Sequence, residues 1–217
     1  MKGPAAPREG PSCPPPLARS RWDPAGGPSN ARGWPLQRGR PAPRVEVRLL
    51  SDDDVPALTA LLGANREHLA PWDPTRPEEY WTEEFQRQDT ARLLDLHRLG
   101  GILPGVVLLD GEPVGRISVN NVVRGPFLSG DLGYWVSRHV TGRGVATAAV
   151  AAMTGWAFGE AGLHRLQAGT LLHNAASQRV LRKSGFTPIG VAPRYLRIAG
   201  EWQDHLLFQL LDEPGMR

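Results

Sequence analysis

The sequence is poor in cysteine, in lysine and in long apolar runs. Cys13 is the only cysteine of the 217 residues, so no internal disulfide can form, and its proline-rich surroundings supply no base to activate it. No apolar run reaches the roughly 18 residues that suggest a transmembrane helix. The N-terminal residues also lack the apolar segment of a secretory signal. We therefore expect a cytoplasmic protein.

Sequence motifs for metal ions and for common nucleotide sites are also missing. There is no HExxH pattern and no cysteine cluster, so we expect no metal. No GxxxxGK[ST] P-loop occurs, and the glycines of TGRGVATAAV do not complete the GxGxxG pattern of dinucleotide-binding proteins. Both of these nucleotide-binding classes are therefore weak candidates.

The charge and the prolines divide the chain in two. Residues 1–43 hold seven basic and two acidic residues and 11 of the 21 prolines, whereas the rest has a net charge of −2. We expect residues 1–43 to be a disordered basic tail rich in Pro, Gly and Arg, and residues 44–217 to be one domain. The tail is either a contact for RNA or an acidic partner, or a dispensable extension or misplaced start. The nearly neutral domain argues against direct nucleic-acid binding.

Hydrophobic periodicity and caps predict alternating elements. Thr75 and Glu78 form a capping-box pattern, Pro77 suits a first helical turn, Asn174 suits an N-cap and Gly185 a C′ position. The expected order is β, α, α, β, β, β, α, β, α, β, β, with strands near 45–50, 102–110, 114–122, 131–138 and 164–172, helices at 51–69, 75–99, 143–159 and 174–183, and a final hairpin over 186–211. This order predicts a mixed α/β sheet with antiparallel strands on both sides of a βαβ unit.

The segment TGRGVATAAV carries the clearest functional signal. It follows the predicted strand DLGYWVSR and begins a helix. Its backbone N–H groups, from about Gly142 to Thr147, are therefore expected to form an anion-binding site at the helix N-terminus. The helix dipole adds to this attraction for negative charge. The alternative is a glycine turn that only connects a strand to a helix.

The wider pattern YWVxxxxxGRGVATxAV, followed by HNAASQRVLRKSGF, resembles the GCN5-related N-acetyltransferase (GNAT) family from about Arg44 to Leu211. His139 stands where that family has Arg or Gln. The stretches HLAPWDP, GYWV, NAAS and RYLRIAGEWQDHLLF further resemble the Rim-type branch, which acetylates N-terminal alanines of ribosomal proteins.

The resemblance implies a mostly antiparallel twisted sheet with about four helices and a splayed central parallel strand pair. It also implies that the strand before the glycine turn bulges and splays from its parallel neighbour. It also implies acetyl-CoA as cosubstrate, with no covalent intermediate. The Val136 backbone would bind pantetheine, and a nearby N–H would stabilise the oxyanion. The residues that it assigns to acetyl-CoA are Val136, Ser137, Gly142, Arg143, Gly144, Val145, Ala146, Thr147, Asn174 and Ser177. For Asn174 the alternative is a plain N-cap.

Three residues are candidates for catalysis: Ser177, Asp131 and Tyr134. By resemblance, Ser177 protonates the leaving thiolate. Asp131 is the first candidate for the base and Glu112 the second. A solvated strand-end acid is the alternative for Asp131, and packing the alternative for Tyr134. Because an N-terminal amine has a pKa of about 7.7–8.0, a water relay would also suffice.

The acceptor groove is assigned to Trp72, Tyr195 and Trp202, with Trp81 as a further candidate and packing as the alternative for these rings. His205 is expected to be structural. The expected partner is the N-terminus of a ribosomal protein, bound by a monomer or homodimer with no membrane contact. Two alternatives stay open: acetylation of a small amine, such as an aminoglycoside, amino acid or polyamine, and an acyl-CoA-binding module without turnover.

Overall fold

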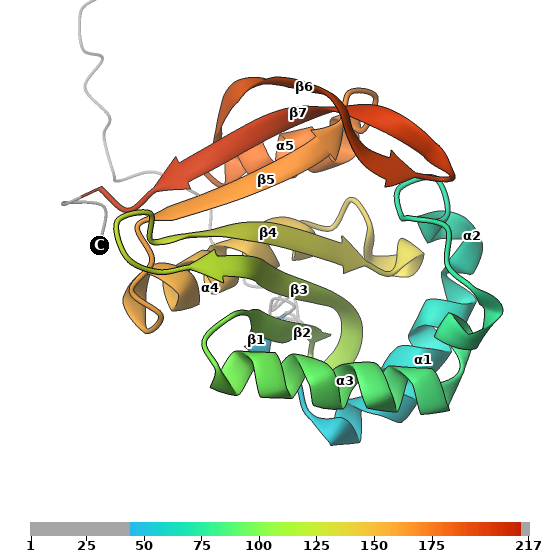
Figure 1. Cartoon of the computed structure of the whole chain (residues 1–217). Coiled ribbons are helices and arrows are strands. Elements are labelled where there is room, and N and C mark those ends of the chain that lie inside the picture. Colours follow the sequence, from blue (N-terminus) through green and yellow to red (C-terminus); the bar gives the residue numbers. More distant parts are fainter. Residues whose placement is uncertain (1–43, 214–217) are drawn as a thin grey trace, which may run out of the picture. The chain divides into compact units, whose positions relative to one another are not determined.

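A computed structural model describes residues 44–213, and these form a seven-stranded mixed sheet in the order β1-β2-β3-β4-β5-β7-β6 (Figure 1). The predicted disordered tail, residues 1–43, lies outside the described residues. All neighbouring strands are antiparallel except β4 and β5. The strands are β1 (Val45–Leu49), β2 (Leu103–Leu109), β3 (Glu112–Val123), β4 (Ser129–Val136), β5 (Arg165–Leu171), β6 (Thr187–Ile198) and β7 (Glu201–Leu211).

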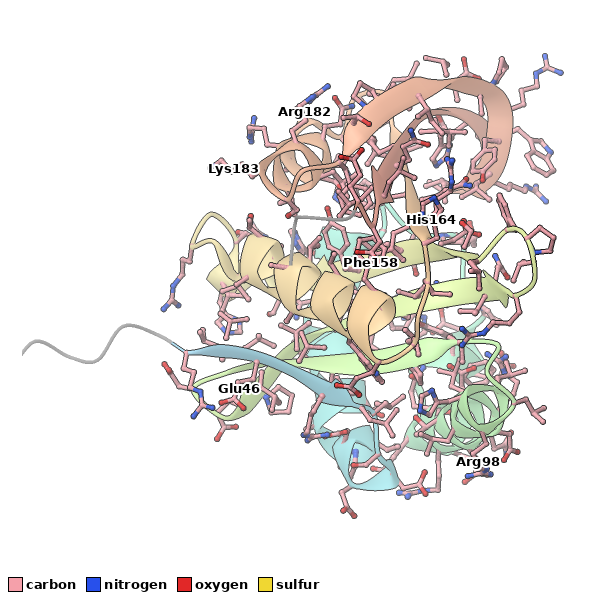
Figure 2. All side chains as sticks on the ribbon, turned by 90° about the vertical axis from the view of Figure 1, so that its left-hand side faces the viewer. Glu46, Arg98, Phe158, His164, Arg182 and Lys183 are labelled. Carbon is pink, nitrogen blue, oxygen red and sulfur yellow. The ribbon has the colours of Figure 1, made fainter. Side chains whose placement is uncertain are left out.

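Helices cover both faces of the sheet. α4 packs across β1 to β4 on one face and contacts α5, as the turned view in Figure 2 shows, whereas α1 and α3 pack on β3 and β2 from the other face. The α-helices are α1 (Val55–Ala64), α2 (Arg66–Leu69), α3 (Glu83–Arg98), α4 (Val145–Gly159) and α5 (Ala175–Lys183), with 3-10 turns η1 (Asp52–Asp54), η2 (Glu78–Trp81) and η3 (Arg138–Val140).

The alternation of β3 shows how the sheet separates its two faces. Ile117 and Val119 are buried in the larger core, which includes Met153 of α4 and Phe208 of β7. Each such side chain contributes about 1.5–3 kcal/mol when it leaves water. The intervening residues of β3 are polar and point to the face of α1 and α3: Arg116, Ser118 and Asn120.

The central parallel pair is short and then opens. β4 and β5 pair only from Ser129 to Asp131 and from Arg165 to Gln167, and beyond these residues the strands diverge toward their C-terminal ends (Figure 1). This confirms the expected mixed fold with its splayed strand pair. The irregularity, however, lies on β3 between Asn120 and Val123, because the β3–β4 register is continuous from Asp131 to Val136. A bulge in β4 itself was therefore a wrong prediction.

The start of the second long helix was also predicted wrongly. Pro77 is extended and Glu78–Trp81 form only a 3-10 turn. α3 begins at Glu83, and its cap is Thr82, seven residues after the expected cap at Thr75; the Thr82 hydroxyl accepts a hydrogen bond from the Phe85 N–H at 3.3 Å. Two glutamates follow each of the two threonines, Glu78 and Glu79 after Thr75 and Glu83 and Glu84 after Thr82, so the charge at the helix start does not distinguish the two caps. The predicted helix over 51–69 divides at Asn65, between α1 and α2.

Candidate active site

A cavity of about 580 Å³ lies where β4 separates from β5. It runs from the start of α4 past the end of β4 to α2 and α5. Ten of the predicted site residues line it: Trp72 of the loop that follows α2, Tyr134, Val136, Gly142, Gly144, Val145, Ala146, Thr147, Asn174 and Ser177. Two of the residues predicted to bind acetyl-CoA, Ser137 and Arg143, are not part of this lining, and neither are the predicted residues Asp131, Tyr195 and Trp202.

The glycine turn has the geometry of an anion cradle. Gly142 and Gly144 have φ angles of 75° and 82°, a left-handed conformation that glycine adopts without strain. A Cβ at either position would meet no atom within 4 Å, so the space in front of the turn is open. The first N–H groups of α4 have no partner inside the helix and lie at its positive end. The turn can therefore receive a phosphate group.

The end of β4 offers backbone groups to the gap between the strands. The Ser137 N–H donates to the Val114 carbonyl on β3 at 2.7 Å. Because successive residues of a strand turn their N–H and C=O groups to opposite sides, those of Val136 point away from β3, toward the gap. This is the geometry that a pantetheine amide needs for strand-like hydrogen bonds.

Two hydroxyl groups meet inside the cavity. The Tyr134 hydroxyl lies 2.8 Å from Ser177 Oγ and also donates to the Ser177 carbonyl at 3.3 Å. Asn174 caps α5 by accepting from the Ser177 N–H at 3.0 Å, which fixes the first turn that carries this serine. Burial raises the pKa of Tyr134 to about 12, and the hydrogen bond with Ser177 opposes this only partly. The Tyr134 hydroxyl therefore keeps its proton at neutral pH.

A buried polar network, which the sequence reasoning missed, supports the turn from behind. Asn65 donates to Ser137 Oγ at 2.9 Å, and its side-chain carbonyl accepts from the Arg138 N–H at 2.8 Å. Ser137 Oγ also lies 2.8 Å from Nδ1 of His139, the residue that departs from the family pattern. Both Asn65 and Ser137 are buried. Ser137 thus lies among the residues that hold the turn in place.

Basic side chains complete the cavity wall. Arg179 and Lys183 line it from α5, and His68 lines it from α2. Arg179 and Lys183 are four residues apart, so both lie on one side of α5. This spacing is the only signal in the sequence that could have indicated their place in the site. Two cations beside a turn that can receive a phosphate suit a ligand with several negative charges.

The two candidate bases lie elsewhere. Asp131 belongs to the paired part of β4, about 10 Å along the strand from Tyr134 at 3.3 Å per residue. Its carboxylate accepts from Asn121 Nδ2 at 2.9 Å, and it is not among the residues that line the cavity. Glu112 opens β3 at the β2–β3 turn and is exposed. The role of either as a base stays a prediction, and the geometry does not favour it.

The expected groove residues are separated. Trp72 lines the cavity and its ring lies 5.5 Å from that of His173. Tyr195 contacts the buried ring of His205, whose Nδ1 lies 3.0 Å from the Gln203 carbonyl, so this histidine is held within the hairpin. Two further tryptophans lie outside the cavity lining: Trp202, which is 62% exposed, and Trp81, which lies under the Arg66 guanidinium.

Residues 44–213 contain neither a membrane-spanning helix nor a cluster of metal-ligating side chains. Across this part of the chain, no helix is long and apolar enough to cross a membrane. Nor do three or more His, Cys, Asp or Glu side chains gather there as ligands for a metal ion.

Comparison with known proteins identifies the family. Residues 44–187 match the family model described as "Acetyltransferase (GNAT) domain". The Escherichia coli [Ribosomal protein uS5]-alanine N-acetyltransferase is 32% identical over 169 residues, which cover 77% of this chain and 87% of that protein. The probable N-acetyltransferase YjcK of Bacillus subtilis is 30% identical over 170 residues, which cover 77% of this chain and 94% of that protein.

A solved structure agrees with these relatives. The Mycobacterium smegmatis RimJ, in complex with CoA-disulfide, superposes with a TM-score of 0.78 at 34% identity, over 82% of this chain and 86% of that one. Its fold and the two sequence relatives point to the same enzyme class. The chain belongs to the GNAT family and is an N-acetyltransferase.

Proposed function

We propose that this protein transfers the acetyl group of acetyl-CoA to the N-terminal alanine of a ribosomal protein. The observation that carries the proposal is the cavity in which the glycine turn, the opened end of β4 and the Tyr134–Ser177 pair come together. The acceptor is proposed because the uS5-alanine N-acetyltransferase of Escherichia coli is similar over most of its length. We also propose that the protein acts in the cytoplasm, as a monomer or a homodimer.

The chain holds acetyl-CoA through three sets of groups. The amides from Gly142 to Thr147 bind the pyrophosphate, and the Val136 backbone binds the pantetheine arm. Arg179 and Lys183 face the remaining phosphate charge from α5. This places the thioester beside Tyr134 and Ser177, at the end of the cavity nearer the opened strands.

The reaction is a direct attack. The neutral amine forms a bond to the thioester carbonyl carbon, and the C–S bond of the tetrahedral intermediate then breaks. Tyr134 and Ser177 donate hydrogen bonds to the departing sulfur. The proton that the nitrogen loses balances the one that the thiolate gains. The pKa of Tyr134 is about 12, well above the value of about 8.5 for a thiol. The Tyr134 hydroxyl therefore donates a hydrogen bond to the thiolate but does not transfer its proton fully.

The acceptor amine needs little help from a base. Its pKa of about 7.7–8.0 leaves a good fraction neutral between about pH 7 and pH 8. Holding the amine against the thioester supplies much of the rate, since positioning alone is worth about 7–11 kcal/mol in favourable cases. Trp72 at the far edge of the cavity is proposed to pack against the first residues of the acceptor.

The experiment uses the protein's own substrates. The full chain is incubated with radiolabelled acetyl-CoA and ribosomal proteins from its host, and the labelled protein is identified by mass spectrometry. Label on the N-terminal alanine of one ribosomal protein supports the proposal. Label only on small amines moves the protein to another acceptor class, and binding of acetyl-CoA without any transfer leaves a module that does not catalyse.

A further inference from the structure

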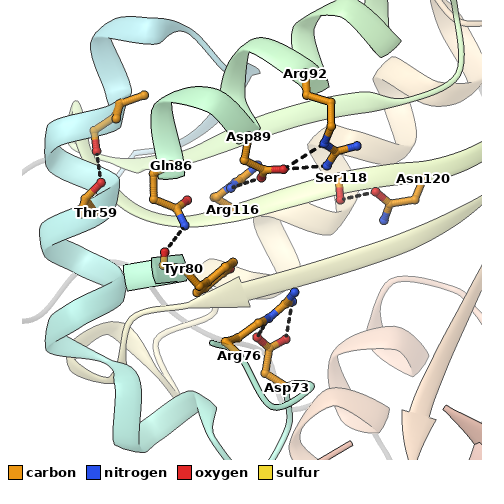
Figure 3. A network of polar contacts seen from close by, with 11 residues as sticks. Thr59, Asp73, Arg76, Tyr80, Gln86, Asp89, Arg92, Arg116, Ser118 and Asn120 are labelled. Atoms are coloured by element: carbon orange, nitrogen blue, oxygen red, sulfur yellow. Dashed lines mark hydrogen bonds and ion pairs between the residues drawn. The ribbon is translucent and has the colours of Figure 1, made fainter. Parts of the chain in front are cut away.

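A polar cluster lies on the sheet face that α4 does not cover, and we call it the Arg116 cluster (Figure 3). It joins side chains from the loop after α2, from η2, from α3 and from β3. Its members are Asp73, Arg76, Tyr80, Asp89, Arg92 and Arg116.

The charges of the cluster do not cancel. Arg76 Nε lies 3.0 Å from Asp73, and Arg92 lies 2.6 Å from Asp89. Arg116 approaches only Asp89, at 4.0 Å, and Asp89 is already held by Arg92. Three guanidinium groups thus share two carboxylates, which leaves one positive charge without its own partner.

Arg116 is the member with unused donors. Its side chain is only 17% exposed, and within the described part of the chain it makes no hydrogen bond to a protein oxygen. Burial lowers the pKa of Arg116, and Asp89 opposes this shift only in part. A guanidinium carries five N–H donors in a fixed fork that suits a carboxylate. A buried charge of this kind normally has an oxygen partner.

The Tyr80 hydroxyl is a second unused donor, and Tyr80 and Arg116 interact electrostatically. The Tyr80 ring lies under the Arg76 guanidinium at 4.6 Å, and its hydroxyl makes no hydrogen bond to any residue of 44–213. Burial raises the pKa of Tyr80, while the charge of Arg76 lowers it in part, so the hydroxyl is a proton donor at neutral pH.

The cluster lies one strand away from the transfer site. Arg116 on β3 is paired with Trp135 on β4, and Trp135 lines the cavity beside Tyr134. Adjacent strands are about 4.8 Å apart. Ser118 and Asn120 continue the same polar row along β3, with Ser118 Oγ 3.2 Å from the Asn120 side-chain oxygen.

We propose that Arg116, with the Tyr80 hydroxyl, binds a carboxylate of the acceptor, carried by an acidic side chain near the acceptor's N-terminus. The inference rests on the proposed function, because it specifies the acceptor of the same reaction. An extended peptide advances about 3.3–3.6 Å per residue. With the acceptor amine at the transfer site, an acidic side chain at the second to fourth residue is therefore long enough to reach Arg116, which lies one strand away on β3. The α-carboxylate of a free amino acid offers the same chemistry, but its carbon lies only two bonds from the amine nitrogen, so it reaches less far toward β3.

The test compares peptides and variants by two independent readouts. The peptides begin with alanine and carry Glu, Gln or Lys at one position from the second to the fourth residue; free alanine represents the small amine. The variants are Arg116→Gln, Arg116→Lys and the matched control Arg87→Gln, which removes an exposed charge of α3 paired with Glu83 outside the cluster. Calorimetric binding to the CoA-loaded protein and kcat/KM with acetyl-CoA are measured for each pair.

The expected result is a preference for the Glu peptide over the Gln peptide of about tenfold, which corresponds to about 1.4 kcal/mol. Arg116→Gln removes this preference, Arg116→Lys retains part of it, and Arg87→Gln leaves it unchanged. Equal binding of the Glu and Gln peptides by the wild-type chain overturns the inference. So does an equal loss for both peptides in Arg116→Gln, which is the mark of a purely structural residue, or a preference for free alanine that depends on Arg116.

The binding readout separates this inference from the proposed function. An Arg116-dependent preference for acidic peptides without any acetyl transfer supports the carboxylate site and contradicts the proposed reaction. Acetyl transfer to alanine peptides without a preference for acidic ones supports the proposed reaction and contradicts the carboxylate site.

Discussion

Replacement of Tyr134 by Phe tests the chemistry at one oxygen atom. The variant keeps the ring, which packs against the core, and removes the hydroxyl that lies 2.8 Å from Ser177 Oγ. If this hydroxyl stabilises the departing sulfur, its loss resembles the removal of one oxyanion-hole donor, which lowers kcat by about 10²–10³-fold. We expect kcat to fall by at least about tenfold, since Ser177 remains as a second donor, and KM for acetyl-CoA to change little.

The assay follows the free thiol that each turnover releases, with the pH varied between 6 and about 10.5. Because burial raises the pKa of Tyr134 to about 12, the wild-type rate rises as the acceptor amine loses its proton and does not fall near pH 10. Loss of one hydrogen bond reduces stability by only about 1 kcal/mol, so circular dichroism and thermal unfolding control for misfolding. A folded Tyr134→Phe variant with kcat within twofold of wild type would refute this role.

Three further predictions concern binding and stability. Gly144→Ala places an alanine in the left-handed conformation, which costs about 1–2 kcal/mol, and displaces the first amides of α4. We expect calorimetry to give a Kd for CoA at least about tenfold higher. An unchanged Kd would contradict the role of the glycine turn in binding phosphate. Asn65→Ala leaves Ser137 and the Arg138 N–H short of partners, so KM for acetyl-CoA rises more than kcat falls; an unaltered KM would show that the turn is held without Asn65. Asp54→Asn weakens the ion pair between the buried Asp54 and the half-exposed Arg48. We expect the free energy of unfolding, measured with urea, to fall by about 1–3 kcal/mol, which is less than for a fully buried pair. Burial is the largest single influence and raises the pKa of Asp54, but the hydrogen bonds from Arg48 and Ser51 and the charge of Arg48 together outweigh it and lower the pKa. The stabilisation is therefore present above the ordinary value of 3.8 and is lost as the pH falls through the folded-state value; an equal loss at pH 2 and pH 7 would contradict it.

Local patterns carried the sequence predictions that the structure confirms. Asn174 caps α5, and Gly185 has the left-handed conformation expected at a helix end, since both depend on the residues beside them. The same holds for Gly142 and Gly144, which fix the turn before α4. These segments follow rules that act within a few residues, so their geometry is readable from the sequence.

Contacts between distant segments explain what sequence reasoning missed. Asn65 lies 72 positions before Ser137, and no pattern around either residue indicates that they meet. The isolation of Arg116 depends on the sheet register and on Arg92 holding Asp89. The α3 start shows a different limit, because Thr75 and Thr82 both have capping signals and only tertiary packing decides between them.

Acetylation of a defined peptide tests the central claim most directly. The full chain is incubated with acetyl-CoA and a synthetic peptide that begins with alanine, beside the same peptide with a blocked α-amine, and the products are sequenced by mass spectrometry. The account predicts one acetyl group on the α-amine of the free peptide, none on the blocked peptide, and one equivalent of free CoA thiol per acetyl group. Acetylation of the blocked peptide at a lysine, or no acetylation while CoA binds in the cavity, would contradict it.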